Sequence, residues 1–427
     1  MQSLDRIGDV GSHGTPPALL RLPHQLLSEK SACSDYEDLR HNPANGKKAE
    51  SPLEGPDPSR WTSQSKDTRL GACVEERFFT RPPIRREVAR LLVTGGAGFI
   101  GANFVRMAVR KGHDVSVLDN LSYAGNLENL RDLLDRGAIT FVRGDVCDPA
   151  VAKESMRGRD AVVHFAAETH VDRSVIEAGE FVRTDVIGTY VLLEAARREN
   201  VGRFLQVSSD EVYGESGPRP SREDSPLNPK SPYAASKAGA DRIAYAYHQT
   251  YGLPVVISRC VNNYGPYQHP EKAIPIFAIS GIADFPLPVY GSGKNRREWI
   301  HVADHCTALF ALLRARGVEG EAFNIGTGER RSTLQVAGAV VDSLKKPRSL
   351  IGRVSDRPGH VASHAVDSAK LRRRTGWRPT HTFDRGLPKT VRWYVENREW
   401  WRATVLKSGR AYFEERYPGL VAAVEKV

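Results

Sequence analysis

The chain has 427 residues, of which 40% are hydrophobic and 26% are charged, so it can bury a sizeable core and exceeds one average domain. Its net charge of +10 suits a substrate that carries phosphates. Because the basic residues are interspersed with acidic ones, we expect no nucleic-acid partner. Five widely spaced cysteines without a CxxC pair predict a reduced, cytoplasmic protein, and we predict no metal site.

Neither a secretory signal nor a membrane span is expected. The N-terminus has no basic flank leading into an apolar core. The most apolar later stretch, residues 273–289, is interrupted by one aspartate and three prolines. We therefore expect a protein without a membrane partner.

Residues 1 to about 86 mix Gly, Pro, Ser, Asn and both signs of charge without a helical or strand period. Such a segment cannot bury enough apolar area to offset its ordering entropy, so we predict a disordered extension. It could be a regulatory or localising tail, or the product of a wrongly chosen upstream start codon.

From Arg90 onward, short β-branched runs alternate with helical stretches. This alternation predicts an α/β fold with a doubly wound parallel sheet. The expected strands are 91–93, 115–118, 139–142, 161–165, 204–207 and 255–257. Two long helices, about 180–199 and 233–251, carry apolar residues on more than one side. One side can cover the sheet and the other a second copy, so we expect a homodimer, with a monomer as the alternative.

A glycine-rich turn follows the first expected strand. Gly95, Gly98 and Gly101 have GxxGxxG spacing and lead into a helical stretch at 100–111. These glycines allow a tight turn and let the backbone approach a pyrophosphate at the amino end of the helix. Asp119 ends the second strand. A carboxylate at this place accepts hydrogen bonds from the ribose hydroxyls and repels a 2′-phosphate, so the pattern predicts a Rossmann-like site for NAD.

Three further residues lie where strands end, as adenine and ribose neighbours of the cofactor or as ordinary packing positions: Asp145, Ala166 and Ala167.

After Gly265 the alternation loosens, and Pro and Gly become frequent. This change predicts a smaller lobe at the carboxyl edge of the sheet, where open α/β sheets bind ligands. We thus expect an NAD-binding core at 87–265 and a mainly substrate-binding lobe at 266–427, from which some chain returns to the core.

Tyr233 and Lys237 are four residues apart, and so lie on one face of the expected helix. Tyrosine alone is a poor base at neutral pH, because its ordinary pKa is about 10. A neighbouring ammonium group stabilises the tyrosinate, so the pair predicts removal of a proton from a sugar hydroxyl as a hydride leaves for NAD. A chance YxxxK match is more often an exposed helix pair, but this one follows a strand that ends in Ser208 and Ser209.

Asp210 and Glu211 follow the same strand directly. Two adjacent carboxyl groups that are buried together push one pKa upward, so one can stay protonated while the other ionises. The first can donate a proton to a departing hydroxyl, and the second can take a proton from the carbon beside a ketone. The alternative is that both merely cap the next turn.

Together with these residues, four longer segments resemble the dTDP-glucose 4,6-dehydratase family of the extended short-chain dehydrogenase/reductase superfamily, in which NAD-dependent epimerases and dehydratases are grouped. The segments are DNLSYAGNL at 119–127, AAETHVDRS at 166–174, NNYGPY at 262–267 and DRPGH at 356–360. The resemblance covers residues 91 to 401, roughly three quarters of the chain.

The resemblance implies a hydro-lyase that makes a 4-keto-6-deoxy sugar nucleotide with one tightly held NAD. Tyr233 takes the proton of the C4 hydroxyl, Glu211 takes the C5 proton, and Asp210 protonates the leaving C6 hydroxyl. Lys237 supports Tyr233, and Ser209 stands where the family usually has threonine. By the same carry-over the NAD contacts include Gly95, Gly98, Phe99, Ile100, Gly101, Asp119, Asn120, Leu121, Ser122, Asp145, Val146, Ala166, Ala167, Thr184, Tyr233, Lys237 and Asn263. The contacts expected for the nucleotide sugar are Thr169, Ser209, Asn262, Lys272, Ala273, Pro288, Tyr290, Arg297, Asn324, Arg357 and His360.

Two departures from the family pattern bear on the nucleotide. After His360 the family usually continues Asp-Arg-Arg-Tyr, whereas this chain has VASH at 361–364, and Ala273 replaces a larger apolar residue. Because of these changes, the sequence does not decide whether the base of the substrate nucleotide is thymine, uracil or another. The alternative functions are an NDP-sugar 4-epimerase or decarboxylase and a non-catalytic NAD-binding regulator.

Overall fold

The computed structural model describes residues 89–356 and 360–427. The predicted extension at 1–86 and the predicted substrate contact Arg357 lie outside the described residues. In the part that is described, no helix is long and apolar enough to cross a membrane.

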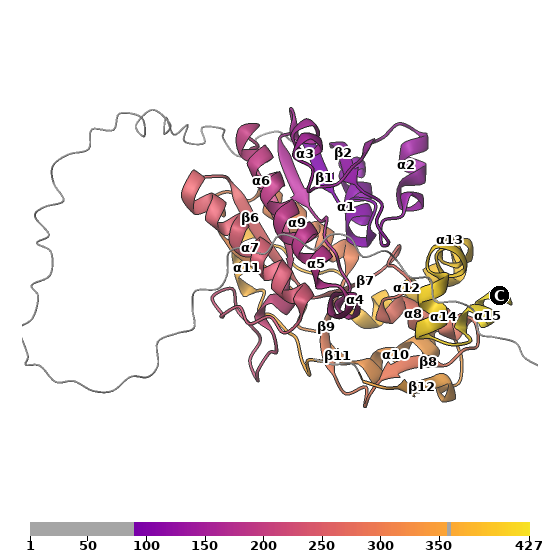
Figure 1. Cartoon of the computed structure of the whole chain (residues 1–427). Coiled ribbons are helices and arrows are strands. Elements are labelled where there is room, and N and C mark those ends of the chain that lie inside the picture. Colours follow the sequence, from indigo (N-terminus) through magenta and orange to yellow (C-terminus); the bar gives the residue numbers. More distant parts are fainter. Residues whose placement is uncertain (1–88, 357–359) are drawn as a thin grey trace, which may run out of the picture. The chain divides into compact units, whose positions relative to one another are not determined.

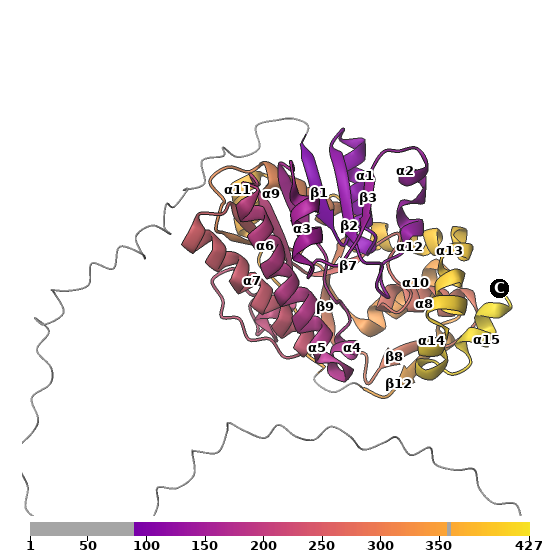
Figure 2. The same ribbon diagram turned by 45° about the horizontal axis from the view of Figure 1, so that its top comes forward.

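A seven-stranded sheet forms the centre of the fold, in the order β10-β6-β5-β4-β1-β2-β3 (Figures 1 and 2). All of its neighbouring strands are parallel. The strands are β1 (Arg90–Thr94), β2 (Asp114–Asp119), β3 (Thr140–Arg143), β4 (Ala161–His164), β5 (Phe204–Ser209), β6 (Val255–Cys260) and β10 (Ala322–Ile325). The six strands predicted from the sequence are all present, and the predicted doubly wound parallel sheet is confirmed.

Helices cover both faces of this sheet because neighbouring strand residues point to opposite sides. Leu91 and Val93 of β1 face one hydrophobic cluster, and Leu92 between them faces another. The first cluster is packed by α1 (Phe99–Arg110), α9 (Val302–Arg314) and α11 (Ala369–Thr375). The second is packed by α3 (Pro149–Met156), α6 (Gly188–Arg198) and α7 (Pro232–Tyr251).

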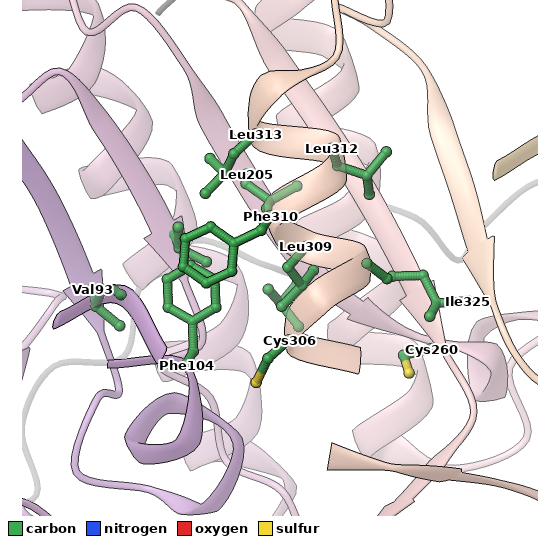
Figure 3. Packing of buried hydrophobic residues seen from close by; sticks show 14 of the residues in the cluster. Val93, Phe104, Leu205, Cys260, Cys306, Leu309, Phe310, Leu312, Leu313 and Ile325 are labelled. Carbon is green, nitrogen blue, oxygen red and sulfur yellow. The ribbon is translucent and has the colours of Figure 1, made fainter. Parts of the chain in front are cut away.

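An aromatic stack joins the first and last parts of the chain on the α1 side of the sheet. Phe104 of α1 and Phe310 of α9 have ring centroids 4.5 Å apart and nearly parallel planes (Figure 3). Phe104 is fully buried, and Leu205 of β5 belongs to the same cluster. This contact packs the second half of α9 against the middle of α1.

The expected helix at 180–199 is interrupted. The chain forms α5 (Ala178–Phe181), then a π-helical segment η3 (Val182–Ile187), and then α6. π-Helical turns are rare and occur frequently at functional sites. The long helix expected at 233–251 is present as α7, which begins with a Ser231 cap.

The remaining chain forms a second cluster of elements with its own hydrophobic core. A three-stranded sheet consists of β7 (Asn262–Tyr264), β9 (Arg296–His301) and β11 (Arg330–Ser332), and a parallel pair consists of β8 (Leu287–Tyr290) and β12 (Ile351–Val354). The helices of this part are α8 (Ala273–Ile282), α10 (Thr333–Ser343), α12 (Phe383–Glu396), α13 (Arg398–Ala403), α14 (Arg410–Arg416) and α15 (Leu420–Glu425), with a π-helical segment η6 (Thr404–Ser408). Between them, β10 returns to the edge of the seven-stranded sheet.

Shorter elements complete the described chain. They are α2 (Arg131–Asp135), α4 (Val171–Ile176) and the 3₁₀ turns η2 (Leu127–Leu130), η4 (Asp210–Tyr213) and η5 (Arg348–Leu350).

Candidate functional site

The glycine-rich turn between β1 and α1 has no room for side chains. Gly95 has a φ of 67°, and a Cβ atom there would lie 2.5 Å from the Ala166 backbone nitrogen. A Cβ atom on Gly101 would lie 2.2 Å from the Gly95 carbonyl oxygen. The turn therefore brings the amino end of α1 against the end of β4, as a backbone cradle for a pyrophosphate requires.

Asp119 stands at the end of β2, beside this turn. Its carboxylate accepts hydrogen bonds from the Ala97 nitrogen at 2.9 Å and the Leu121 nitrogen at 2.8 Å. Burial raises the pKa of Asp119, and these two hydrogen bonds oppose the shift. The carboxylate thus shapes the loop after β2, and it lines the cavity in which a ribose would lie.

A cavity of about 410 Å³ runs from the glycine-rich turn to the second cluster of elements. This volume is in the range of small-molecule sites. Its walls include most of the predicted cofactor contacts: Gly95, Gly98, Phe99, Ile100, Gly101, Asp119, Asn120, Ser122, Val146, Ala166, Ala167, Thr184, Tyr233, Lys237 and Asn263. They also include the predicted substrate contacts Thr169, Ser209, Asn262, Lys272, Ala273, Pro288, Tyr290, Arg297 and His360. The fit of the turn, Asp119 and the cavity supports NAD as the cofactor.

Three predicted contacts do not line this cavity. Asp145 instead pairs with Arg183 at 2.7 Å. Leu121 takes a left-handed backbone conformation with a φ of 57°, and its nitrogen donates to Asp119. Asn324 also stands outside the cavity walls.

Asn324 is fully buried on β10, at the edge of the sheet. Its amide oxygen accepts from the Tyr213 hydroxyl at 2.8 Å, and its amide nitrogen donates to the Ser221 carbonyl at 3.0 Å. Tyr213 in turn accepts from Arg259, whose guanidinium group is paired with Asp241. The side chain is committed to this network, so the predicted contact of Asn324 with a sugar nucleotide is not supported.

Tyr233 and Lys237 both line the cavity from α7. Burial and the nearby Glu211 carboxylate raise the pKa of Tyr233, and a side-chain hydrogen bond with Ser209 opposes the shift. Burial lowers the pKa of Lys237, opposed by the carboxylates of Asp185 and Asp241. Lys237 Nζ donates to the Val207 carbonyl oxygen at 2.9 Å, which ties α7 to β5.

The two carboxyl groups after β5 have different surroundings. Asp210 is buried, and burial together with the charges of Glu211 and Glu298 raises its pKa well above the ordinary value. Its Oδ2 atom has no hydrogen-bond partner among the described residues. Both groups line the cavity. The raised pKa favours the protonated form of Asp210, which can donate a proton to a ligand.

The sequence alone also did not identify the buried acids Asp185 and Glu271. Asp185, on the π-helical segment, accepts from Ser236 at 2.6 Å and from the Glu168 nitrogen at 2.9 Å, and burial raises its pKa to about 6. Glu271 follows the NNYGPY segment. Although burial opposes its charge, Lys272, two histidines and Arg173 lower its pKa to about 2. Neither stands in a recognisable motif, and the signal that could have found Glu271 is its place next to the predicted contact Lys272.

Comparisons with known proteins agree with this site. A family model described as GDP-mannose 4,6 dehydratase matches residues 92–390. A dTDP-glucose 4,6-dehydratase of Streptomyces niveus is 48% identical over 318 residues, which are 73% of this chain and 94% of the relative. The chain belongs to the 4,6-dehydratase family. The resemblance inferred from the four sequence segments is thereby confirmed.

Solved structures give the same result. A dTDP-glucose 4,6-dehydratase from Streptomyces venezuelae, crystallised with NAD bound, matches with a TM-score of 0.72 and 48% identity, covering 74% of this chain and 99% of that chain. A UDP-glucose 4-epimerase of Thermus thermophilus in complex with NAD matches with a TM-score of 0.67 and 32% identity, covering 72% and 99%. These matches confirm NAD as the cofactor of the fold.

A single glycine-to-alanine substitution tests whether the glycine-rich turn is the backbone cradle for NAD. We expect Gly101→Ala to weaken NAD binding at least tenfold, because the new Cβ atom must push the Gly95 carbonyl away and open the turn. Calorimetric titration of NAD into cofactor-free protein measures the effect. Gly179→Ala is the matched control, since a Cβ atom there meets no atom within 4 Å. Equal NAD affinity in the two variants would contradict the assigned cradle.

Proposed function

We propose that this protein dehydrates a nucleotide-activated glucose, dTDP-glucose in the first place, to the 4-keto-6-deoxy sugar nucleotide. The observation that carries the proposal is the buried carboxyl group of Asp210 beside Glu211, in the same cavity as Tyr233 and the glycine-rich turn. The match to this chain spans nearly the whole length of relatives that are dTDP-glucose 4,6-dehydratases. This match favours thymidine as the nucleoside of the substrate.

Each residue has a separate role in the proposed reaction. Tyr233 takes the proton of the C4 hydroxyl as that carbon becomes a ketone, with Ser209 binding the same oxygen. Glu211 removes the C5 proton, which the ketone has acidified. Asp210 gives its proton to the C6 hydroxyl, which leaves as water, and Glu211 finally returns a proton to C5.

NAD, when bound, supplies the acceptor for the C4 hydride and the donor that returns it to C6, and its cationic ring favours the tyrosinate. Lys237 lies one helical turn after Tyr233 on α7, and its ammonium group supports the same charge. Arg297 and Lys272 line the other part of the cavity, where cations would hold a diphosphate.

The 4-epimerase alternative shares the fold and the cofactor, as the match to the Thermus thermophilus enzyme indicates. An epimerase has no need to expel water, and so needs no protonated carboxyl group beside a second carboxylate. The raised pKa of Asp210 therefore favours dehydration over epimerisation and over a non-catalytic regulator.

A panel of NDP-hexoses tests this function. We expect dTDP-glucose to lose one water, seen as a lower product mass and as the alkaline absorbance of a 4-keto sugar. Glu211→Gln should oxidise C4 and stop, because the amide cannot take the C5 proton, leaving reduced cofactor on the protein and turnover lowered at least 100-fold.

Glu215→Gln is the matched control, because Glu215 is exposed four residues further along the chain. Unchanged product mass with every NDP-hexose would contradict dehydration. Wild-type turnover of Glu211→Gln would remove Glu211 from the mechanism.

We also propose a homodimer that buries one apolar face. Large apolar side chains are exposed on four adjoining elements, namely α4, η3, α6 and α7: Val175, Ile176, Val182, Ile187, Tyr190, Tyr245 and Tyr251. Ile176 is 86% exposed and Val175 is 55% exposed, which is unfavourable in a monomer. Helices α6 and α7 lie side by side at this face (Figure 1). We also propose a cytoplasmic location, which is supported by the three free cysteines among the described residues.

Light scattering tests the dimer. We expect the wild-type mass to be twice that of one chain, and Tyr190→Lys to lower it toward one chain because a charge would be buried in the interface. Val395→Lys, at an exposed apolar position of α12, should leave the mass unchanged. A monomeric wild-type protein would contradict the proposal.

A further inference from the structure

His305 is a buried histidine at the wall of the cavity, with no role in the chemistry described above. It lies in the first turns of α9, directly after β9. Its side chain is fully shielded from solvent, and it lines the cavity together with Asn263. The sequence patterns did not single it out.

The hydrogen bonds of Asn263 decide which nitrogen of His305 carries the proton. Asn263 Nδ2 lies 3.0 Å from the Val261 carbonyl oxygen, which can only accept, so the amide nitrogen must face it. Asn263 Oδ1 therefore faces His305 Nδ1, at 3.0 Å. An amide oxygen can only accept, so Nδ1 of His305 is the protonated, donating nitrogen.

It follows that Nε2 of His305 bears a lone pair. Burial lowers the pKa of His305 to about 3, so the ring is neutral at working pH and Nε2 cannot donate. This atom is buried and has no hydrogen-bond partner among the residues that the structure describes. A buried acceptor without a partner is costly, and it is satisfied when a ligand brings a donor.

The polar atoms of Asn263 are already used. Its second amide hydrogen is directed at Cys260 Sγ, 3.3 Å away, and its backbone oxygen accepts from Gln268 at 2.9 Å. The side-chain amide of Asn263 thus makes internal hydrogen bonds, and its predicted contact with NAD stays a prediction. Nε2 of His305 is therefore an acceptor open to a ligand here, and Oε1 of the neighbouring Gln268 is a second one without a partner among the described residues.

Nε2 of His305 lies toward the reactive end of the cavity. Asn263 contacts Cys260, and Cys260 is the register partner of Ser209 across β5 and β6. Ser209 shares a side-chain hydrogen bond with Tyr233. The nicotinamide must approach the carbon whose hydroxyl Tyr233 deprotonates, so the ring and its carboxamide belong in this neighbourhood.

We propose that Nε2 of His305 accepts a hydrogen bond from the carboxamide N–H of the nicotinamide, and so fixes the orientation of the ring. The inference rests on the proposed function, since it requires NAD in this cavity. In this arrangement His305 is a cofactor-binding residue, held in the required tautomer by Asn263. An imidazole acceptor distinguishes a carboxamide from a group that lacks an N–H.

Binding of two dinucleotides tests the proposal without turnover. One is NAD, and the other is its 3-acetylpyridine analogue, in which a methyl group replaces the carboxamide nitrogen and no donor remains. We expect cofactor-free wild-type protein to bind NAD about tenfold more tightly than the analogue, the effect of one lost hydrogen bond to a buried acceptor. Calorimetry or quenching of tryptophan fluorescence gives both dissociation constants.

Two substitutions separate the two ring nitrogens. The amide nitrogen of His305→Asn can replace Nδ1 as the donor to Asn263 but puts nothing at Nε2, so we expect it to bind NAD and the analogue equally. His305→Gln can place an oxygen near Nε2 and should keep a preference for NAD. Thermal unfolding of the cofactor-free proteins shows that each variant is folded.

An unreduced preference for NAD in folded His305→Asn would overturn the proposal. If that variant does not fold, the wild-type protein decides, because equal affinity for the two dinucleotides would also overturn it. Failure of the wild-type protein to bind either dinucleotide would contradict the proposed function itself, and is thereby distinguished from failure of the histidine contact.

Discussion

The chemistry of this protein depends on a carboxyl group whose charged form is unfavourable. Asp210 is buried directly after β5, with Glu211 as its neighbour in the chain and Glu298 close by. Ionising all three in a space shielded from water would place like charges together at high cost, which raises the pKa of Asp210 and favours its protonated form. The fold thereby places a carboxyl group that favours its proton directly beside a second carboxyl group, and a dehydration requires an acid and a base in such a position.

The parallel sheet explains how distant residues come to share this site. The carboxyl ends of β1, β2, β4 and β5 lie along one edge and carry the glycine-rich turn, Asp119, the Ala166 pair and the acid pair. The second cluster of elements closes the cavity from the other side with Lys272 and Arg297. The stack of Phe104 on Phe310 packs α9, the helix that carries His305, against α1.

Much of this arrangement was predictable from local patterns. Short β-branched runs located the ends of the six strands to within about three residues, because buried parallel strands are apolar on both faces. The glycine spacing and the position of Tyr233 and Lys237 on one helix located the cavity. The family resemblance supplied roles that the spacing alone left open.

What the sequence could not show depends on pairing between distant segments. Asn324 was expected at the substrate, but its strand lies at the sheet edge, where Tyr213 and Ser221 take up its amide. The π-helical turn that buries Asp185 appeared only as part of a longer helix. His305 acquires its tautomer from Asn263, 42 residues earlier, a relation that no local pattern contains.

The protonation state of Asp210 can be measured directly. Infrared difference spectra between the wild-type protein and Asp210→Asn at neutral pH should contain the carbonyl band of a protonated carboxylic acid that the variant lacks. Isotope-labelled aspartate assigns the band to this residue type. A spectrum in which only carboxylate bands differ would show that Asp210 is ionised, and would contradict its role as the acid that expels water.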